Sequence, residues 1–292
     1  MENHDYYSLL ENEIFKDLGY RGIETMWQKG SLREAAFAIL KRDKILPSYI
    51  LTGFCCMFNR CETDGPLGSS VLCSTLRALG YNATLLTDSY SEPVVRAAAF
   101  TNPILSKDNP SDITEISFIV SVERPGRSKK TYDFRTMSAR DISHCTAPID
   151  LLFPLEGHTK KEYLTIGIGD GGNEVGTGNI SDEVCKYVKN GEDICTSICA
   201  DILIMAGVSN WGALALAAAL VIASKNTEAA SVFIEQCNKQ PEILQKMIDA
   251  GSFDGCTGKK ELSIDNMMYD KEHLSVTLSL ISIVKEAFQL SD

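Results

Sequence analysis

The sequence lacks the basic clusters by which nucleic-acid-binding proteins are recognised. Its 292 residues contain 28 lysines and arginines against 39 aspartates and glutamates, a formal net charge of -11 at pH 7. Such a charge repels a phosphate backbone, so we expect no nucleic-acid partner. There are only four histidines, and they are too scattered along the chain to suggest a ligand cluster.

The ten cysteines lack the paired spacing of a zinc site. Cys55, Cys56 and Cys61 form no Cys-x-x-Cys pair, and Cys195 and Cys199 lie one helical turn apart or further. We therefore interpret the cysteines as reduced thiols that mostly fill the core rather than as nucleophiles. The chain also has no Gly-x-Ser-x-Gly elbow and no phosphate-binding Gly-x-x-x-x-Gly-Lys loop.

Targeting and membrane segments are also scarce. Residues 1–5 (MENHD) show neither a basic start followed by an apolar stretch nor the arginine-rich character of a transit peptide, which predicts a cytoplasmic protein. One apolar run, residues 202–223, is about long enough to span a bilayer. Because its middle is polar and punctuated by glycine, we predict a buried strand, a turn and a buried helix, and no membrane partner.

From residue 48 onward, β-rich apolar runs alternate with helical patterns, which predicts an α/β fold: a mainly parallel sheet flanked by helices on both faces (three-layer α/β/α). The expected strands are 49–54, 83–87, 116–122, 163–168 and 202–206. The expected helices include 67–79, 93–100 (capped by Ser91), 182–189 (capped by Ser181) and 211–224.

The N-terminal part has a helical pattern of its own. Ser31 and Glu34 have the spacing of a capping box ahead of the apolar run 35–40. We therefore predict that residues 1–46 form a helical segment that packs on an α/β domain of residues 47–292. No repeat, low-complexity tract or linker divides the chain further.

Acidic or polar residues follow each expected strand, where an open parallel sheet places its ligand site. These residues are Glu62 and Asp64, Asp88, Glu123 and Arg124, Asp170, Asn173 and Glu174, and Ser209 and Asn210. Converging carboxylates repel one another unless a cation lies between them, which favours Mg²⁺ or Mn²⁺. A loop acid taken alone is equally typical of a helix cap, but flanking glycines favour function for Asp64 and Asp170.

Two further patterns concern binding. Residues 167–172 match the Gly-x-Gly-x-x-Gly dinucleotide fingerprint, but Asp170 and Glu174 would face the pyrophosphate and the next helix signal comes late, so we do not favour nucleotide binding. Arg124, Arg127 and Arg135 are candidates for gripping a substrate carboxylate, although the last two fit a solvated surface equally well.

Four segments together resemble the D-glutamate cyclase family, specifically its C-terminal catalytic-type domain. They are residues 62–66 (ETDGP), 122–126 (VERPG), 167–174 (GIGDGGNE) and 206–212 (AGVSNWG), and their order and spacing also fit. The likeness spans residues 48–269. It departs from the usual pattern at residues 264–266, where IDN stands in place of the more usual VDG.

The resemblance implies conversion of D-glutamate, a small acidic amino acid, to 5-oxo-D-proline and water, formally a carbon–oxygen lyase reaction. Eukaryotic relatives carry an additional upstream domain and act in mitochondria, which makes the mitochondrial matrix the alternative compartment. Two other functions remain open from the residues: a metal-dependent hydrolase or phosphatase, and a non-catalytic protein that binds an acidic amino acid. A homo-oligomer is compatible with either.

Within this resemblance the site residues receive expected roles. A cation could polarise the γ-carboxylate, Glu62 or Glu123 could move protons, and Arg124 would hold the α-carboxylate. We also expect Asn210 and Trp211 to border the pocket, the alternative being a helix cap and a core residue. The expected sets are catalytic Glu62, Asp64, Glu123 and Asp170; substrate-binding Arg124, Asn173, Ser209 and Asn210; and metal-binding Asp64, Asp170 and Glu174.

Overall fold

The protein is described here from a computed structural model, which covers residues 5–19 and 21–290. Six strands form one sheet in the order β5-β4-β1-β6-β7-β8, and every neighbouring pair is parallel. The strands are β1 (Ser48–Thr52), β4 (Ala83–Thr87), β5 (Ile104–Ser106), β6 (Phe118–Val122), β7 (Leu164–Gly169) and β8 (Ile202–Met205). The expected α/β class is confirmed. The sequence missed only β5 among these strands, a three-residue edge strand that is half-buried throughout.

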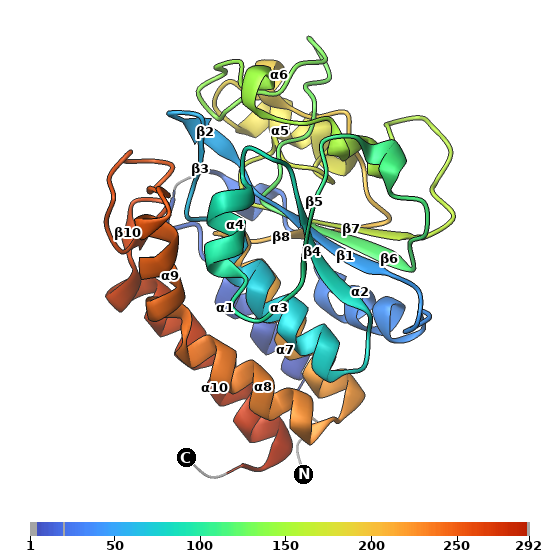
Figure 1. Ribbon diagram of the computed structural model, residues 1–292, viewed down its shortest axis with the longest axis vertical. Coiled ribbons are helices and arrows are strands. Elements are labelled where there is room, and N and C mark those ends of the chain that lie inside the picture. The colour runs from blue at the N-terminus through green and yellow to red at the C-terminus, as the bar shows by residue number, and fades with distance from the viewer. Residues whose placement is uncertain (1–4, 20, 291–292) are drawn as a thin grey trace.

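Alternating side chains on the strands face two hydrophobic layers, as the two-residue period of a strand requires. Ile50 and Val120 face the first layer, and Leu51 and Ile119 face the second. Helices cover the first face of the sheet (Figure 1). They are α1 (Tyr6–Ile14), α2 (Ser31–Leu40), α3 (Pro66–Ala78), α7 (Ser209–Ser224), α8 (Thr227–Asn238), α9 (Gln240–Asp249) and α10 (Leu274–Phe288), with α4 (Glu92–Ala98) near the β5 edge.

The second face is covered by shorter elements. Leu203 and Met205 of β8 pack there against α5 (Ser181–Tyr187) and α6 (Gly191–Ile194), while the middle of the sheet packs against irregular chain and short 3-10 helices. Helices therefore lie on both faces, as expected.

The remaining elements are η1 (Ile23–Thr25), η2 (Pro110–Asp112), η3 (Ser143–Cys145), η4 (Ile149–Leu152), η5 (Gly178–Ile180), the π-helical turn η6 (Tyr269–His273), and the two-stranded ribbons β2 (Cys55–Met57) with β3 (Arg60–Cys61) and β9 (Ser263–Ile264) with β10 (Met267–Met268).

The apolar run 202–223 forms strand β8, a turn and helix α7, as predicted. Residues of α7 are buried all round from Ser209 to Val221, the pattern of a central helix rather than a surface one. Helices α2, α3 and α10 pack around it. Among the residues that the structure describes, no helix is long and apolar enough to cross a membrane.

The expected capping box at Ser31 and Glu34 is wrong. Ser31 is the first residue inside α2, and Gly30 occupies the cap position without a side-chain hydrogen bond. Instead, the Glu11 carboxylate of α1 accepts hydrogen bonds from the backbone amides of Gly30 (2.9 Å) and Leu32 (3.2 Å). An acid from another helix satisfies the free amides and complements the helix dipole, which a local pattern cannot reveal.

Two other expectations concern the chain termini and the cysteines. The prediction about targeting rests on residues 1–5, of which residues 1–4 lie outside the described part of the chain. All ten cysteines are free, and most are buried, in agreement with their interpretation as core thiols.

The departure from the family pattern at residue 266 has a conformational reason. Asp265 (φ +55°) and Asn266 (φ +63°) both lie in the left-handed region of backbone space. Glycine reaches this region freely, and asparagine is among the side-chain-bearing residues that tolerate it best. Asn266 can therefore occupy the β9–β10 turn in place of the usual glycine.

Candidate active site

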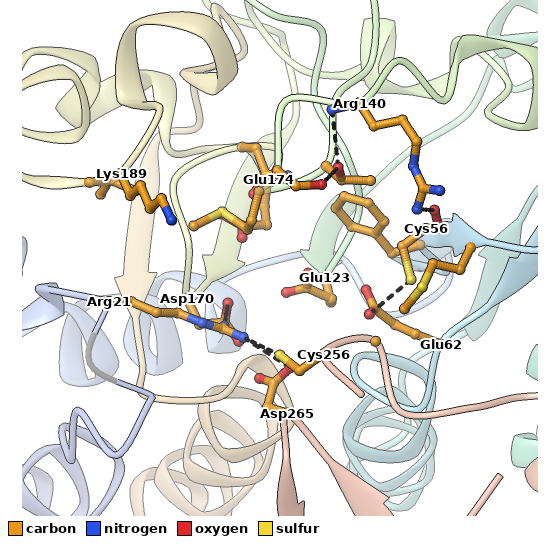
Figure 2. Close-up of a pocket in the computed structure, with 18 of the residues that line it drawn as sticks. Arg21, Cys56, Glu62, Glu123, Arg140, Asp170, Glu174, Lys189, Cys256 and Asp265 are labelled. Carbon is orange, nitrogen blue, oxygen red and sulfur yellow. Dashed lines mark hydrogen bonds and ion pairs between the residues drawn. The ribbon is translucent and has the colours of Figure 1, made fainter. Parts of the chain in front are cut away.

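A cavity of about 630 Å³ opens beyond the carboxyl ends of the strands. It lies near β1 and β6, where the chain switches from building the sheet in one direction to building it in the other, the usual place for a ligand in such sheets. Acids outnumber bases in the lining of the cavity: Figure 2 shows acidic side chains around it, and the acids that line it are Glu62, Glu123, Asp170, Glu174 and Asp265.

Three buried carboxylates meet beside this cavity; Glu123 and Asp170 line it, whereas Asp64 does not. Asp64, Glu123 and Asp170 each offer one oxygen, and these oxygens all lie within 4.8 Å of one another. The backbone amide of Ser209 lies 3.1 Å from both Asp64 Oδ2 and Asp170 Oδ2. Glu123 and Asp170 directly follow β6 and β7, and Asp64 lies in the connection from β1 to α3, after the β2–β3 ribbon, so the parallel sheet brings the three acids to one edge. Closely spaced carboxylate oxygens are what a hard divalent cation requires, and the residues present therefore fit Mg²⁺ or Mn²⁺.

The backbone conformations of Gly65 and Glu123 allow the carboxylates to lie this close together. Gly65 adopts φ +95°, and a Cβ atom there would lie 2.7 Å from the Glu123 Cβ. Glu123 itself has φ +47°, a conformation that is strained for a residue with a side chain. Such strain is typical of functional sites, because a side chain is then aimed where an ordinary strand end would not place it.

Burial dominates the electrostatics of the acids. It raises the pKa of Asp64 to about 7, with the nearby Asp265 carboxylate adding to the effect. Burial also raises the pKa of Glu62 and of Glu123 well above the ordinary value, again with neighbouring acids contributing. The acids therefore hold protons at neutral pH or require a cation among them.

Arg21 supplies a cation that the sequence analysis missed. Its guanidinium pairs with Asp170 and, at 3.0 Å, with Asp265. The Asp17 carboxylate accepts the backbone amides of Arg21 (2.8 Å) and Gly22 (2.7 Å) and so holds this loop in place. No local motif distinguishes Arg21 from other arginines. Its role follows from the packing of the N-terminal segment against the cavity.

Asn173 and Glu174 both line the cavity, but their side chains differ in their hydrogen bonds. The Asn173 Nδ2 donates to the Arg135 carbonyl (2.7 Å), and its buried Oδ1 has no hydrogen-bond partner. Glu174 instead accepts the amides of Gly171 (2.9 Å) and Gly172 (2.8 Å), one on each oxygen. Both Glu174 oxygens thus contact its own loop, and the set of close carboxylate oxygens contains Glu123 with Asp64 and Asp170 but not Glu174.

Arg124 lies outside the cavity lining. It is buried, its Nη2 contacts Asp88 Oδ2 at 2.7 Å, and its guanidinium donates to the carbonyls of Gly53 (3.0 Å) and Ala147 (2.7 Å). These partners hold the side chain within the protein. The expected role of gripping the substrate carboxylate therefore needs another cation.

The first turn of α7 contacts the acids of the site and the start of α3. Ser209 Oγ donates to Glu123 Oε2 at 2.7 Å, which orients that carboxylate. Asn210 Oδ1 accepts the amides of Gly65 (3.1 Å) and Gly68 (2.7 Å), so it caps α3 rather than its own helix. Trp211 is buried and donates to His273. Asn210 and Trp211 do not line the cavity, which corrects the expectation that they border it.

Fold and site together define an α/β protein with a buried, acid-rich cavity at the carboxyl edge of its sheet. A family model described as D-glutamate cyclase-like, C-terminal, matches residues 10–281, and the chain belongs to this family. The chain is 32% identical over 242 residues to "D-glutamate cyclase, mitochondrial" of Homo sapiens. The match covers 73% of this chain and 38% of the human protein, so the chain spans well under half of that relative's length.

Proposed function

We propose that this protein is a carbon–oxygen lyase that closes D-glutamate into 5-oxo-D-proline with release of water. The observation that carries the proposal is the cluster of Asp64, Glu123 and Asp170, two of which line an acid-rich cavity, in a member of the D-glutamate cyclase-like family. The relative's name supports the substrate, and the cavity supports the chemistry of a carboxylate that must be neutralised before it reacts.

We assign the cation-holding role to Asp64, Glu123 and Asp170, with Mg²⁺ or Mn²⁺ as the ion. When bound, such an ion supplies Lewis acidity that makes the carboxylate carbon easier to attack. Ser209 keeps Glu123 oriented through its 2.7 Å hydrogen bond. Arg21 reduces the repulsion between Asp170 and Asp265 without neutralising the whole set of acids.

Ring closure needs a neutral amine and a protonated leaving oxygen. The partnerless Oδ1 of Asn173 can accept a hydrogen bond from the substrate amine. Glu62 lines the cavity and its pKa is raised by burial, so it can pass a proton from the amine to the departing oxygen. The amine nitrogen then bonds to the carbon of the γ-carboxyl group, one carbon–oxygen bond of that group breaks, and the oxygen leaves as water with the two protons that the substrate's ammonium group has lost. Because a five-membered closure is favourable once the ends are oriented, orientation and charge neutralisation are the main tasks of the site.

The test is a chirality-resolved product assay. The purified protein is incubated with D- or L-glutamate, with and without Mg²⁺ or Mn²⁺, and 5-oxoproline is measured. We expect faster product formation from D-glutamate and a dependence on the ion. Equal rates with both enantiomers, or no product from either, would contradict the proposal.

The same cluster of oxygens suits a metal-dependent hydrolase, because phosphate chemistry also uses carboxylate-bound cations. Generic phosphate esters therefore belong in the assay, with phosphate release as the readout. Binding of D-glutamate without any product would favour a sensor.

For the compartment, we propose the cytoplasm, with the mitochondrial matrix as the alternative suggested by the human relative's name. Fractionation of cells that express the native chain would separate the two.

A further inference from the structure

Two basic residues that line the cavity, Arg140 and Lys189, pair with no acid among the residues that the structure describes, and both are exposed. Of the basic residues that line it, Arg21 is paired with Asp170 and Asp265, and Arg140 donates to the Cys56 carbonyl at 2.7 Å. Within residues 5–19 and 21–290, no hydrogen bond or ion pair engages the Lys189 ammonium group. Figure 2 shows the Lys189 side chain extending from the rim toward the interior of the cavity.

The backbone around Lys189 is anchored on both sides. Val188 is buried in the cluster formed with α5, α6 and β8. Asn190 donates from Nδ2 to the Met137 carbonyl at 3.0 Å, just as Asn173 donates to the carbonyl of Arg135. The loop that carries Lys189 and the side chain of Asn173 are thus tied to one segment, residues 135–137. Groups fixed to a common support can act together on one ligand.

Besides the reacting γ-carboxylate, the substrate has two groups that the cavity must hold, a negatively charged α-carboxylate and the amine. The γ-carboxylate belongs beside the carboxylate cluster, where Glu62 can reach the departing oxygen. The α-carboxylate cannot face five lining acids without a cation, and Arg124 is committed to Asp88. The amine can donate a hydrogen bond to Asn173 Oδ1, which is buried and has no other partner. Among the described residues, Lys189 is the lining cation that has neither an acid nor a hydrogen-bond acceptor as partner, and it is therefore free for the α-carboxylate.

We propose that Lys189 binds the substrate α-carboxylate and, with Asn173, selects an α-amino acid whose α-carboxylate is free. This inference rests on the proposed function and adds a residue that determines specificity. Lysine suits the task because its ammonium group is a flexible point charge at the end of a four-carbon stem.

The experiment compares Lys189→Met with Lys186→Met, a matched change at another exposed lysine, which lies in α5 and does not line the cavity. Two substrates are used: D-glutamate, and its α-amide D-isoglutamine, which lacks the α-carboxylate. For Lys189→Met we expect the KM for D-glutamate to rise about tenfold, the effect of losing one charged hydrogen bond, with kcat little changed. The KM for D-isoglutamine should stay at its parental value. Lys189→Arg should retain most of the binding, and Lys186→Met should change neither KM.

Equal rises in KM for both substrates, or none for D-glutamate, would overturn the assignment of Lys189. Calorimetric titration with D-glutamate separates this failure from failure of the proposed function. If the parent binds D-glutamate without turnover, Lys189→Met should still weaken binding, and undiminished binding overturns the role of Lys189 alone. If the parent neither binds nor converts D-glutamate, both proposals are wrong.

Discussion

Two arginines near the carboxyl edge of the same sheet, the buried Arg124 and the half-buried Arg21, have different surroundings. Arg124 faces one acid, Asp88, at 2.7 Å, and its remaining contacts are backbone carbonyls. Arg21 faces a set of acids in excess, pairing with Asp170 and Asp265 while further carboxylates line the same cavity. The first arrangement is balanced in charge, and the second is not.

This difference separates a structural pair from a functional cluster. A buried pair of opposite charges is neutral without a ligand, and removing one partner leaves an unpaired charge in the protein interior. An unbalanced cluster is unfavourable by itself and gains stability when a cation or protons enter. Excess of one charge, rather than the presence of an arginine, therefore marks the binding site.

The largest expected effect is on stability, from breaking the balanced pair. Arg124→Met should lower the free energy of unfolding by about 3–5 kcal/mol, because Asp88 is left buried without its cation. Urea denaturation measures this loss, and adding Asp88→Asn to the same chain should recover part of it. Protein that remains folded should bind D-glutamate normally. A stable Arg124→Met variant that fails to bind substrate would instead support the sequence-based prediction that Arg124 holds the substrate α-carboxylate.

Neutralising one acid of the unbalanced cluster should lower turnover strongly and change the free energy of unfolding little. Asp64→Asn should reduce turnover by about a hundredfold or more, the usual cost of losing a positioned catalytic group. Metal-free stability at pH 8 should stay within about 1 kcal/mol of the parent, since an amide oxygen can still accept from Gly65 and Asn210. Asp270→Asn, at an exposed acid, is the control for charge. Unfolding of Asp64→Asn together with a parent indifferent to Mg²⁺ and Mn²⁺ would make the aspartate structural.

The pH dependence of stability also distinguishes the unbalanced cluster of acids from the balanced pair. The folded state holds the pKa of Asp64 at about 7, above the value of about 3.9 expected in the unfolded chain. Its contribution to stability is therefore fully present below about pH 3.9 and is lost as the pH rises through about 7. We expect the melting temperature of the metal-free parent to fall across this range more than that of Asp64→Asn. Identical slopes, measured by circular dichroism at constant ionic strength, would contradict the raised pKa.

The smallest expected effect concerns Asn210, which supports the site without entering it. Asn210→Ala should cost about 1–2 kcal/mol, because the amides of Gly65 and Gly68 lose the oxygen that caps α3. The KM for D-glutamate should change less than about threefold, a difference below 1 kcal/mol. Thermal melting and steady-state kinetics measure the two effects. A large rise in KM at unchanged stability would place Asn210 in contact with substrate after all.

Much of the fold was visible in local patterns. Strand β4 lies at residues 83–87 as predicted, and β1, β7 and β8 differ from the prediction by one or two residues at their ends. Runs of β-branched and aliphatic residues bounded by glycine and polar turns carry this information. Edge strand β5 was missed because three half-buried residues have no distinct pattern.

The sequence by itself determined that acids would gather at one edge, because residues that follow parallel strands meet at the same end of a sheet. That logic brought Asp64, Glu123 and Asp170 to one site. Only the tertiary structure decided which arginine faces those acids and which lysine stays free. Arg21 and Asp265 come from opposite ends of the chain, and Lys189 comes from a loop beyond α5. Their positions depend on how distant segments pack, and charge pairing in the interior depends on distances that no local pattern contains.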